Sequence, residues 1–511
     1  MTQSETQAAT IDQLPRTLGK LRASGYRSRS VREEIRENLV RKIERGETLF
    51  PGIHGYEQTA LPEIENALLS GQDIIILGER GQAKSRMIRA FVDLLDDHMP
   101  VVAGSEINDD PLEPISKYAR ELVAEKGDET PVDWVPRDAR YGEKLATPDV
   151  TMTEMLGDVD PIKVAEGRYL SDELTIHYGL IPRTNRGVFC INELPDLAER
   201  IQVGLFNLME ERDVQIKGYR VRLPLDVLIV ATANPEDYTN RGRIITPLKD
   251  RYGAQVRTHY PHRTEDELRI VEQERSRYSD SEQRVRVPAY ISEIIAELTS
   301  LARKSPEVNQ RSGVSVRMTT ANLETVRSAA YRRALRHGEA TGVPRISDLP
   351  AVIASTRGKL ELETIEEGRE VEVIEDLTKR AVLEVFNRHV DADGLLEVVS
   401  AFESGLSVEA GADMPAEEYV RAAGQLPAID SLFQKLSVGD DPAEIASALE
   451  FILEGLHLNR MLNRDTSGDN VTYSQQYDWS QWQSAGGDDP GASGQSGRRR
   501  GERRRRRQND Y

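Results

Sequence analysis

The sequence predicts an α/β fold with a parallel sheet, because buried-strand patterns alternate with helical patterns in its first half. Short apolar runs at residues 73–77, 188–191 and 227–231 are typical of strands that are covered on both faces. Helical patterns follow the first two runs, at residues 84–96 and 196–210. Strands that alternate with helices in this way favour one sheet with helices on both of its faces.

The second half of the chain predicts a different architecture, made mainly of helices. We expect about three helices between residues 264 and 357 and further helices between residues 374 and 463. In the first half, a long polar insertion ends at about residue 185, and residues 213–217 and 219–223 form a hairpin pattern. The chain therefore divides into a flexible N-terminus at 1–29, an α/β core at 30–262, a helical lid at 263–357, a mostly helical C-terminal region at 358–465 and a disordered tail at 466–511.

Composition limits the classes of protein to which this chain can belong. Its 511 residues exceed the size of one compact core, and 30% of them are charged, with a net charge of −19. The longest apolar runs are far shorter than a membrane span, and the N-terminus lacks the apolar stretch of a signal peptide. A single cysteine, Cys190, excludes an internal disulfide framework and a cysteine-based zinc site. We therefore expect a cytoplasmic protein that does not contact membranes.

The end of the chain carries a basic patch that contrasts with the acidic whole. Residues 491–511 contain eight arginines and two acidic residues, Glu502 and Asp510. A chain with a negative net charge is a poor general binder of nucleic acid. We expect a solvated tail, and contact with nucleic acid through this tail stays open.

A glycine-containing loop lies between the first predicted strand and the helix that follows it. The loop consists of Gly78, Glu79, Arg80, Gly81, Gln82, Ala83, Lys84 and Ser85. A strand, a glycine turn and a helix N-terminus are the context of a phosphate-binding loop. We expect the N–H groups of the loop to face phosphate oxygens, Lys84 to reach the β- and γ-phosphates of ATP, and Ser85 to bind Mg²⁺. Ala83 occupies the position of the usual second glycine, where a methyl group is tolerated if φ stays negative.

Polar residues also follow the second and third predicted strands. Asn192 and Glu193 come directly after the run at 188–191, and Asn234 follows the run at 227–231. At such a strand end, we expect Glu193 to polarise the attacking water and Asn192 to hold Mg²⁺ through a water molecule. The amide of Asn234 can hold the γ-phosphate or the attacking water. Because an asparagine brings no charge, Asn192 predicts weak Mg²⁺ affinity and slow turnover.

The order of these motifs resembles the AAA+ clade that contains magnesium chelatase subunit I and the MoxR ATPases. Residues 50–55, 177–187 and 209–217 are similar to its adenine-contacting lead-in, to the stretch before its Walker B strand and to its pre-sensor 1 hairpin. Residues 154–168 lie where the clade has its helix 2 insert. The resemblance covers about residues 30–357 and implies an AAA+ P-loop core with a helical lid.

The resemblance also implies roles for three residues. Asn234 occupies the sensor 1 position. Residues 247–252 are similar to a Leu-Asp-Arg-Phe signature, which implies that Arg251 enters the site of the neighbouring subunit as a finger. Residues 312–317 are similar to the sensor 2 stretch, with a valine in place of its proline, which implies a γ-phosphate contact for Arg317.

The function that the resemblance implies is ATP hydrolysis, with ATP and Mg²⁺ as cofactors, in a hexameric ring. The resemblance further implies a partner with a von Willebrand A domain, and turnover that remodels a partner protein or loads a metal into it. Two alternatives stay open: a nucleic-acid-directed motor or transcription regulator, and a scaffold that binds ATP but barely hydrolyses it. The sequence lacks a recognisable helix-turn-helix and the Gly-Ala-Phe-Thr-Gly-Ala loop of one class of transcription activators, which disfavours the first alternative.

Overall fold

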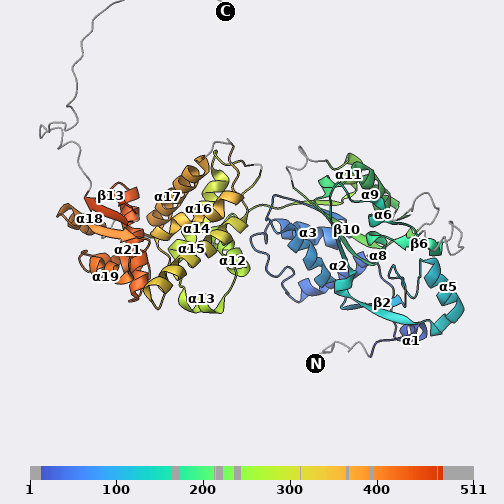
Figure 1. The fold of residues 1–511 in the computed structure, drawn as a ribbon. Helices are drawn as coiled ribbons and strands as arrows, with labels where there is room; N and C mark the ends of the chain where they lie inside the picture. The colour runs from blue at the N-terminus through green and yellow to red at the C-terminus, as the bar shows by residue number, and fades with distance from the viewer. Residues whose placement is uncertain are drawn as a thin grey trace, which may run out of the picture.

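A computed structural model of the protein describes residues 13–160, 162, 173–211, 213–214, 223–234, 243–310, 312–363, 368–390, 395–468 and 470–475. Figure 1 shows two lobes, an α/β lobe built from the first half of the chain and a helical lobe built from the second half. This arrangement confirms the predicted α/β core that is followed by helical regions.

A five-stranded parallel sheet forms the centre of the first lobe. Its strands are, in spatial order, β11 (Ala254–Arg257), β1 (Ile74–Leu77), β10 (Val227–Ala233), β7 (Gly187–Asn192) and β4 (Tyr141–Leu145). Every residue of β1, β7 and β10 is buried, as the three apolar runs predicted. Because these strands are parallel, their carboxyl ends lie at the same edge of the sheet.

Alternate residues of the central strands enter two separate apolar cores. Ile74 and Ile76 pack with α2 (Val31–Glu44) and α3 (Ala60–Leu69) on one face of the sheet. Ile75 and Leu77 pack with α9 (Glu199–Glu211) on the other face. Successive side chains of a strand point to opposite faces, so helices cover both sides of the sheet. Cys190 lies in the first core, where burial raises the pKa of its thiol to about 12.

The two helices predicted after the first strands are present, with different bounds. The predicted helix at 84–96 is α4 (Lys84–Arg89), followed by a tighter 3₁₀ segment at Ala90–Leu94. The predicted helix at 196–210 is α9, which leads into a hairpin that is described only at its base. There β8 (Asp213–Val214) pairs with β9 (Leu223–Pro224), and the other residues of the predicted hairpin lie outside the described residues.

The segment between α4 and β7, which includes the predicted polar insertion, contains regular structure. β2 (His98–Val102) pairs with β3 (Val132–Pro136) in a separate antiparallel ribbon, whereas β4 is an edge strand of the central sheet. The sequence does not predict β4, because an edge strand is only partly covered and its Tyr-Gly-Glu-Lys-Leu residues form no apolar run. The other elements are α5 (Lys117–Lys126), α6 (Met152–Met155), β5 (Gly157–Val159), β6 (Ile176–Tyr178) and α8 (Leu180–Arg183).

The N-terminal segment, predicted to be flexible up to residue 29, contains a packed helix. α1 (Leu18–Ala23) begins after Thr17, whose side chain caps its first turn. Leu18 and Leu21 are fully buried, and the Leu18 N–H donates to the Thr130 carbonyl oxygen at 2.9 Å. The prediction is therefore wrong for this helix, because two leucines three residues apart outweigh the polar residues around them.

The helical lobe has one continuous apolar core, which contains buried side chains from residue 271 to residue 473. Its first helices, more than the three predicted, are α12 (Thr264–Glu274), α13 (Ser279–Arg284), α14 (Ala289–Lys304), α15 (Val316–His337) and α16 (Val352–Thr356). They are followed by α17 (Arg369–His389), α18 (Leu395–Glu403), α19 (Ala416–Ala423), α20 (Ile429–Lys435) and α21 (Pro442–Leu458). Among the described helices of both lobes, none combines the length and apolar character that a membrane span requires.

A three-stranded antiparallel sheet packs against these helices. Its strands are, in spatial order, β12 (Val408–Gly411), β14 (Asn470–Gln475) and β13 (Leu462–Ser467). Tyr473 is buried, and its hydroxyl donates to Glu454 of α21 at 2.6 Å. The disorder predicted from residue 466 is therefore wrong for β14 and for the end of β13, because strands with one buried face and many polar residues carry little apolar signal. The Arg-rich tail itself lies outside the described residues.

A buried ion pair fixes β4 to the rest of the α/β lobe. Arg140, directly before β4, is fully buried and donates to both carboxylate oxygens of Glu34 in α2, at 2.7 and 2.6 Å. Its Nε also donates to the carbonyl oxygen of Arg186, directly before β7, at 2.9 Å. Breaking such a pair is costly, because one charge stays buried without its partner.

We therefore expect Arg140→Ala to lower the free energy of unfolding by about 3–5 kcal/mol. Arg137 provides a control, because it is more exposed and pairs with Asp93 and Asp97 at 3.4 Å each. Arg137→Ala should cost only about 0–1 kcal/mol. Urea unfolding of the two variants measures the difference, and equal losses would show that the Arg140 pair does not anchor β4.

Candidate functional site

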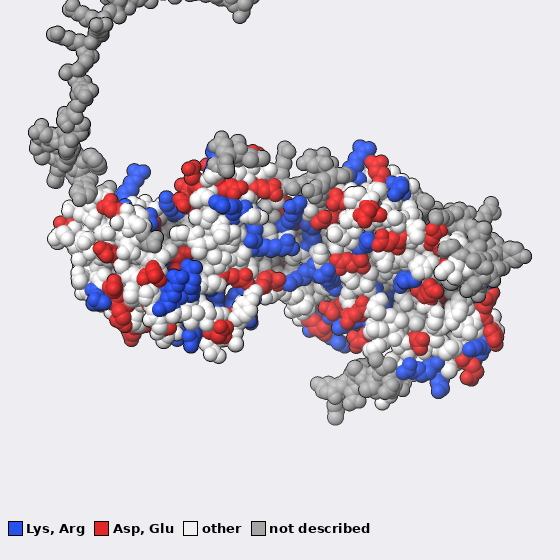
Figure 2. All heavy atoms as spheres, viewed as in Figure 1, with Lys and Arg blue, Asp and Glu red and all other residues white. Residues whose placement is uncertain are grey.

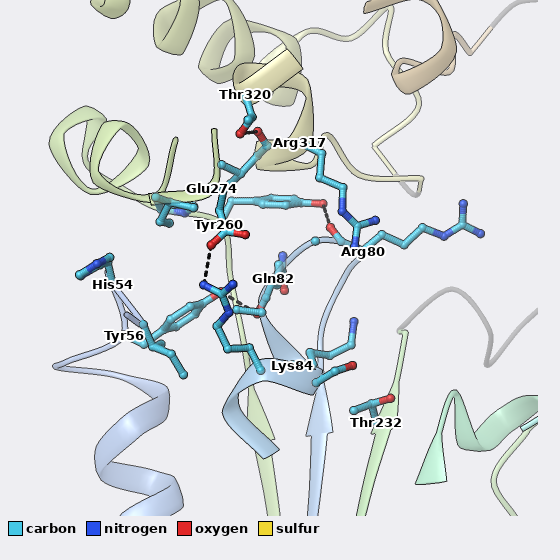
Figure 3. Close-up of a pocket in the computed structure, with 18 of the residues that line it drawn as sticks. His54, Tyr56, Arg80, Gln82, Lys84, Thr232, Tyr260, Glu274, Arg317 and Thr320 are labelled. Carbon is cyan, nitrogen blue, oxygen red and sulfur yellow. Dashed lines mark hydrogen bonds and ion pairs between the residues drawn. The ribbon is translucent and has the colours of Figure 1, made fainter. Parts of the chain in front are cut away.

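The carboxyl-end edge of the central sheet borders a cavity of about 660 Å³. The α/β lobe contributes residues from the ends of β1, β7 and β10, and the helical lobe contributes residues from α12 and α15 (Figure 3). Lys and Arg side chains gather where the two lobes meet (Figure 2), which favours an anionic ligand. The structure brings together on this cavity the predicted residues Arg80, Gly81, Gln82, Ala83, Lys84, Ser85, Asn192, Glu193, Asn234 and Arg317.

Two glycines allow the tight path of the loop that follows β1. A Cβ atom on Gly78 would lie 1.8 Å from Thr258 Oγ1, so the backbone passes too close to the end of β11 for any side chain. Gly81 has a φ of +76°, a left-handed conformation that glycine adopts without strain. The Gln82 side chain braces the turn, because its Oε1 accepts hydrogen bonds from the Glu79 N–H at 3.0 Å and from Thr258 Oγ1 at 2.7 Å.

Ala83 contradicts the expectation that its φ stays negative. Its φ is +57° and its ψ is +15°, in the left-handed region. The turn that leads into the first residue of α4 needs this conformation, and the methyl group makes it cost about 1–2 kcal/mol. The loop therefore keeps the backbone shape that a glycine would adopt without strain, at a cost in stability.

Lys84 joins the loop to the tip of β10. Its ammonium group donates hydrogen bonds to the carbonyl oxygens of Gly78 and Glu79 and to Asn234 Oδ1, the last two at 2.7 Å. Asn234 is buried directly after β10. Two motifs that are 150 residues apart in sequence thus meet through one side-chain hydrogen bond.

Asn192, at the end of β7, is the centre of a second group of polar contacts. Its Oδ1 accepts hydrogen bonds from Ser85 Oγ at 3.4 Å and from Thr232 Oγ1 at 3.2 Å. Its Nδ2 donates to Glu143 Oε1 on β4. Thr232 and Glu143 could not be predicted from the sequence, because neither residue belongs to a motif and β4 has no apolar run.

Glu193 occupies a strained position directly after β7. Its φ is +56° and its ψ is +47°, in the left-handed region that a glutamate rarely adopts. Its N–H donates to Thr232 Oγ1 at 3.0 Å, which helps to hold this conformation. Residues kept in such conformations concentrate at functional sites, where the surrounding structure compensates for the strain.

The helical lobe contacts the glycine loop through the start of α15. A Cβ atom on Gly81 would lie 2.0 Å from Ser315 Oγ, so the two segments are in direct contact. Arg303 of α14 holds this part of the lid, because its Nε donates to the Val314 carbonyl oxygen at 2.9 Å. Two residues after Ser315, Arg317 reaches the cavity (Figure 3).

Arg251 does not line this cavity. It is the last residue of α11 (Thr246–Arg251), and it forms an ion pair with Glu210 of α9 at 2.6 Å. Its guanidinium carbon lies 5.1 Å from the centre of the Phe206 ring. Of the four predicted catalytic residues, Arg251 is thus the one that the structure separates from the others.

Among the residues of the cavity wall that were not predicted are Tyr56, Glu274 and Tyr260. Tyr56 is buried and donates to the His259 carbonyl oxygen at 2.6 Å, and burial raises the pKa of its phenol, so the hydroxyl stays protonated. Glu274 of α12 pairs with Arg86 of α4 at 2.6 Å, a contact between the two lobes. Tyr56 follows the predicted adenine-contacting stretch directly, but no sequence signal identifies the other two.

The oxygen atoms around Ser85 fit a Mg²⁺ ion whose other ligands are phosphate oxygens and water molecules. Within the described ranges, no group of three or more His, Cys, Asp or Glu residues is placed to hold a metal ion. Ser85 Oγ and Asn192 Oδ1 are neutral donors that lie together at the end of the loop. Mg²⁺ keeps several waters and binds one or two protein groups plus substrate phosphates, so this donor set suits a metal that arrives with a nucleotide.

Comparison with known proteins points to one group of relatives. The chain is 27% identical over 273 residues to magnesium-chelatase subunit ChlI of Nostoc sp., covering 51% of this chain and 66% of that protein. It is 28% identical over 217 residues to chloroplastic ChlI-1 of Arabidopsis thaliana, covering 41% of this chain and 46% of that protein. The chain therefore spans about half to two thirds of the length of these curated relatives. No protein-family model matches the chain.

Solved structures add only a loose similarity. A chain in the complex between subunits BchI and BchD of magnesium chelatase is 21% identical, with a TM-score of 0.35. The match covers 64% of this chain and 98% of that chain. A TM-score this low supports no conclusion about function.

The parallel sheet, the glycine loop at its edge and the helical lid define the class: a P-loop protein with an AAA+ core. Within this class, the chain resembles the ChlI subunit of magnesium chelatase.

The strain at Ala83 leads to a stability prediction. Ala83→Gly should raise the free energy of unfolding by about 1 kcal/mol, because glycine removes the left-handed penalty but adds entropy to the unfolded chain. Ala124 is a control, because it is exposed in the helix α5. Ala124→Gly should lower stability by about 1 kcal/mol. Urea unfolding checks both variants, and a loss of stability at both positions would contradict the strain at Ala83.

Proposed function

We propose that the protein is a Mg²⁺-dependent ATPase that works in the cytoplasm as a ring of subunits. The observation that carries the proposal is the hydrogen bond between Lys84 and Asn234, beside the cavity that Asn192 and Glu193 also line. Phosphoryl transfer to water requires a cationic group, a polar amide and a carboxylate next to a glycine loop.

Each of these residues acts on a different part of the reaction in this proposal. The loop N–H groups and the start of α4 bind the phosphates, and Lys84 contacts the β- and γ-phosphate oxygens. Glu193 orients the attacking water, and Asn234 holds the γ-phosphate or this water. Ser85 binds Mg²⁺ directly and Asn192 holds it through a water molecule. When bound, Mg²⁺ neutralises charge on the β- and γ-phosphates.

Two arginines supply further positive charge from different subunits. Arg317 acts from the lid of the same chain, since it lines the cavity. Arg251 acts on the neighbouring subunit, since it lies outside the cavity of its own chain. A residue supplied in this way requires a head-to-tail contact, and such contacts close into rings. The resemblance implies six subunits.

We further propose that turnover remodels a partner protein or loads a metal into it. The curated relatives are named as subunits of magnesium chelatase, which supports a role beside other chains. A partner with a von Willebrand A domain is the one that the resemblance implies. Movement of the lid against the core would change the contact between Glu274 and Arg86, and the hairpin that follows α9 would pass the movement to the partner.

The second candidate function is a scaffold that binds ATP but hydrolyses it slowly. Asn192 favours this candidate, because an amide attracts Mg²⁺ less than a carboxylate does. Asn192→Asp separates the two functions. A gain in turnover of tenfold or more would favour the scaffold, whereas an unchanged or lower rate favours the ATPase with its natural asparagine.

We expect Lys84→Ala to lose ATP binding and Glu193→Gln to keep ATP binding but lose at least about 100-fold in turnover. The physical reason is that Lys84 contacts the phosphates in the bound state, whereas Glu193 acts on the water. Phosphate release and equilibrium binding of a fluorescent ATP analogue measure the two effects. Lys126→Ala, at an exposed position of α5, is the control. Natural turnover in both site variants would refute the assignment.

Arg251→Ala should lower turnover by about 1,000-fold or more and leave ATP binding intact, because Arg251 serves the neighbouring site. Mixing this variant with Lys84→Ala should restore part of the activity, since an intact pocket in one subunit then receives Arg251 from the other. A mixture of Lys84→Ala and Glu193→Gln is the control, because neither subunit has an intact pocket. If mixing with the Arg251 variant restores no more activity than the control mixture, Arg251 does not act between subunits.

A further inference from the structure

We propose that Glu143 is a positioning residue of the Mg²⁺ site, which orients Asn192 and places a negative charge behind it. The inference rests on the proposed ATPase function. In P-loop ATPases an aspartate at the corresponding strand end holds the metal, and this chain has the neutral Asn192 there. The structure places a carboxylate on the neighbouring strand, in contact with that amide.

The position of Glu143 follows from the register of the two strands. β4 pairs with β7 in parallel, with Glu143 opposite Cys190 and Leu145 opposite Asn192. Asn192 is 8% exposed, and its Nδ2 donates to Glu143 Oε1. The carboxylate is therefore the direct neighbour of the amide and lies on the far side of it from Ser85.

The contacts of Asn192 fix which way its amide points. A carboxylate can only accept hydrogen bonds, so the atom next to Glu143 is the amide nitrogen. The amide oxygen then faces the hydroxyls of Ser85 and Thr232, both of which can donate. The Glu143 carboxylate thus sets the orientation of the amide, the two hydroxyl contacts are compatible with it, and the oxygen is turned toward the proposed Mg²⁺ position.

Glu143 is itself held in place from two further sides. Arg89 donates to its two carboxylate oxygens at 3.0 and 3.1 Å, and the Tyr141 hydroxyl donates to Oε2 at 3.1 Å. Arg89 belongs to α4, the helix that starts at the phosphate-binding loop. The Arg89 side chain is 63% exposed, so its pair with Glu143 is screened by solvent and leaves much of the carboxylate charge acting on the buried amide.

Partners behind a metal ligand change metal affinity by about 10–100-fold, because they orient the ligand and raise its basicity. Glu143→Gln keeps an acceptor for the Asn192 amide but removes the charge. We expect the Mg²⁺ concentration at half-maximal binding of a fluorescent ATP analogue to rise about tenfold or more in this variant. Affinity for the same analogue in EDTA should stay the same. Glu154→Gln is the control. It removes a carboxylate that pairs with Lys144 of β4, and it should change neither the Mg²⁺ concentration at half-maximal binding nor the affinity in EDTA.

A change of background separates this role from a structural one. In an Asn192→Asp background the ligand carries its own charge and there is no amide to orient, so adding Glu143→Gln should raise the Mg²⁺ requirement much less than it does in the natural background. Arg89→Gln is a second variant, which leaves the Glu143 charge less neutralised and should lower the Mg²⁺ concentration required. A structural role predicts that Glu143→Gln weakens Mg²⁺ binding equally in the two backgrounds and that Arg89→Gln weakens it as well.

The outcomes distinguish failure of this inference from failure of the proposed function. If the natural protein binds the ATP analogue with Mg²⁺ and Glu143→Gln leaves the Mg²⁺ requirement unchanged, the role of Glu143 is refuted and the ATPase assignment stands. The role of Glu143 is also refuted if Glu143→Gln weakens binding equally in the two backgrounds. If the natural protein does not bind the analogue at all, the proposed function fails first.

Discussion

Parallel strands end at one edge of a sheet, and this constraint brings the site of the protein together. The end of β1 carries the glycine loop, the end of β10 carries Asn234, and the hydrogen bond from Lys84 to Asn234 joins them. β7 lies on the other side of β10 and brings Asn192 and Glu193 to the same cavity. Without this parallel register, residues from distant parts of the sequence could not line one cavity.

Backbone strain is concentrated at this same edge, whereas a buried ion pair holds the opposite edge of the sheet, where β4 and β7 begin. Ala83 and Glu193 both adopt left-handed conformations, one at the end of the loop and one at the tip of β7. The apolar cores on both faces of the sheet compensate for this cost, because they make the strands rigid. The buried pair of Arg140 and Glu34 extends the rigid region to β4, the strand that carries Glu143. β4, the least apolar strand of the sheet, is thus held by an ion pair and carries the carboxylate of Glu143 at the site.

The parts of the structure that could be predicted are those with a local signal. Three strands that are buried on both faces appear in the sequence as apolar runs, and the polar residues behind them follow at once. β4 and the strands β12, β13 and β14 carry no such signal, because their buried residues alternate with polar ones or have few apolar neighbours. Glu143 could not be predicted for the same reason, because its contact with Asn192 depends on a strand pairing that no short motif encodes. The left-handed φ of Ala83 is set by the path of the turn and not by the residue itself.

The central claim is that the groups at the ends of β1 and β7 act on the same terminal phosphate. The most direct test is a crystal structure of the Glu193→Gln protein with ATP and Mn²⁺ in place of Mg²⁺. We expect Lys84 Nζ to lie at about 3 Å from a γ-phosphate oxygen and the side chain at position 193 to reach the same phosphate through one water molecule. A nucleotide bound outside this cavity, or a γ-phosphate that approaches only one of the two side chains, would contradict it.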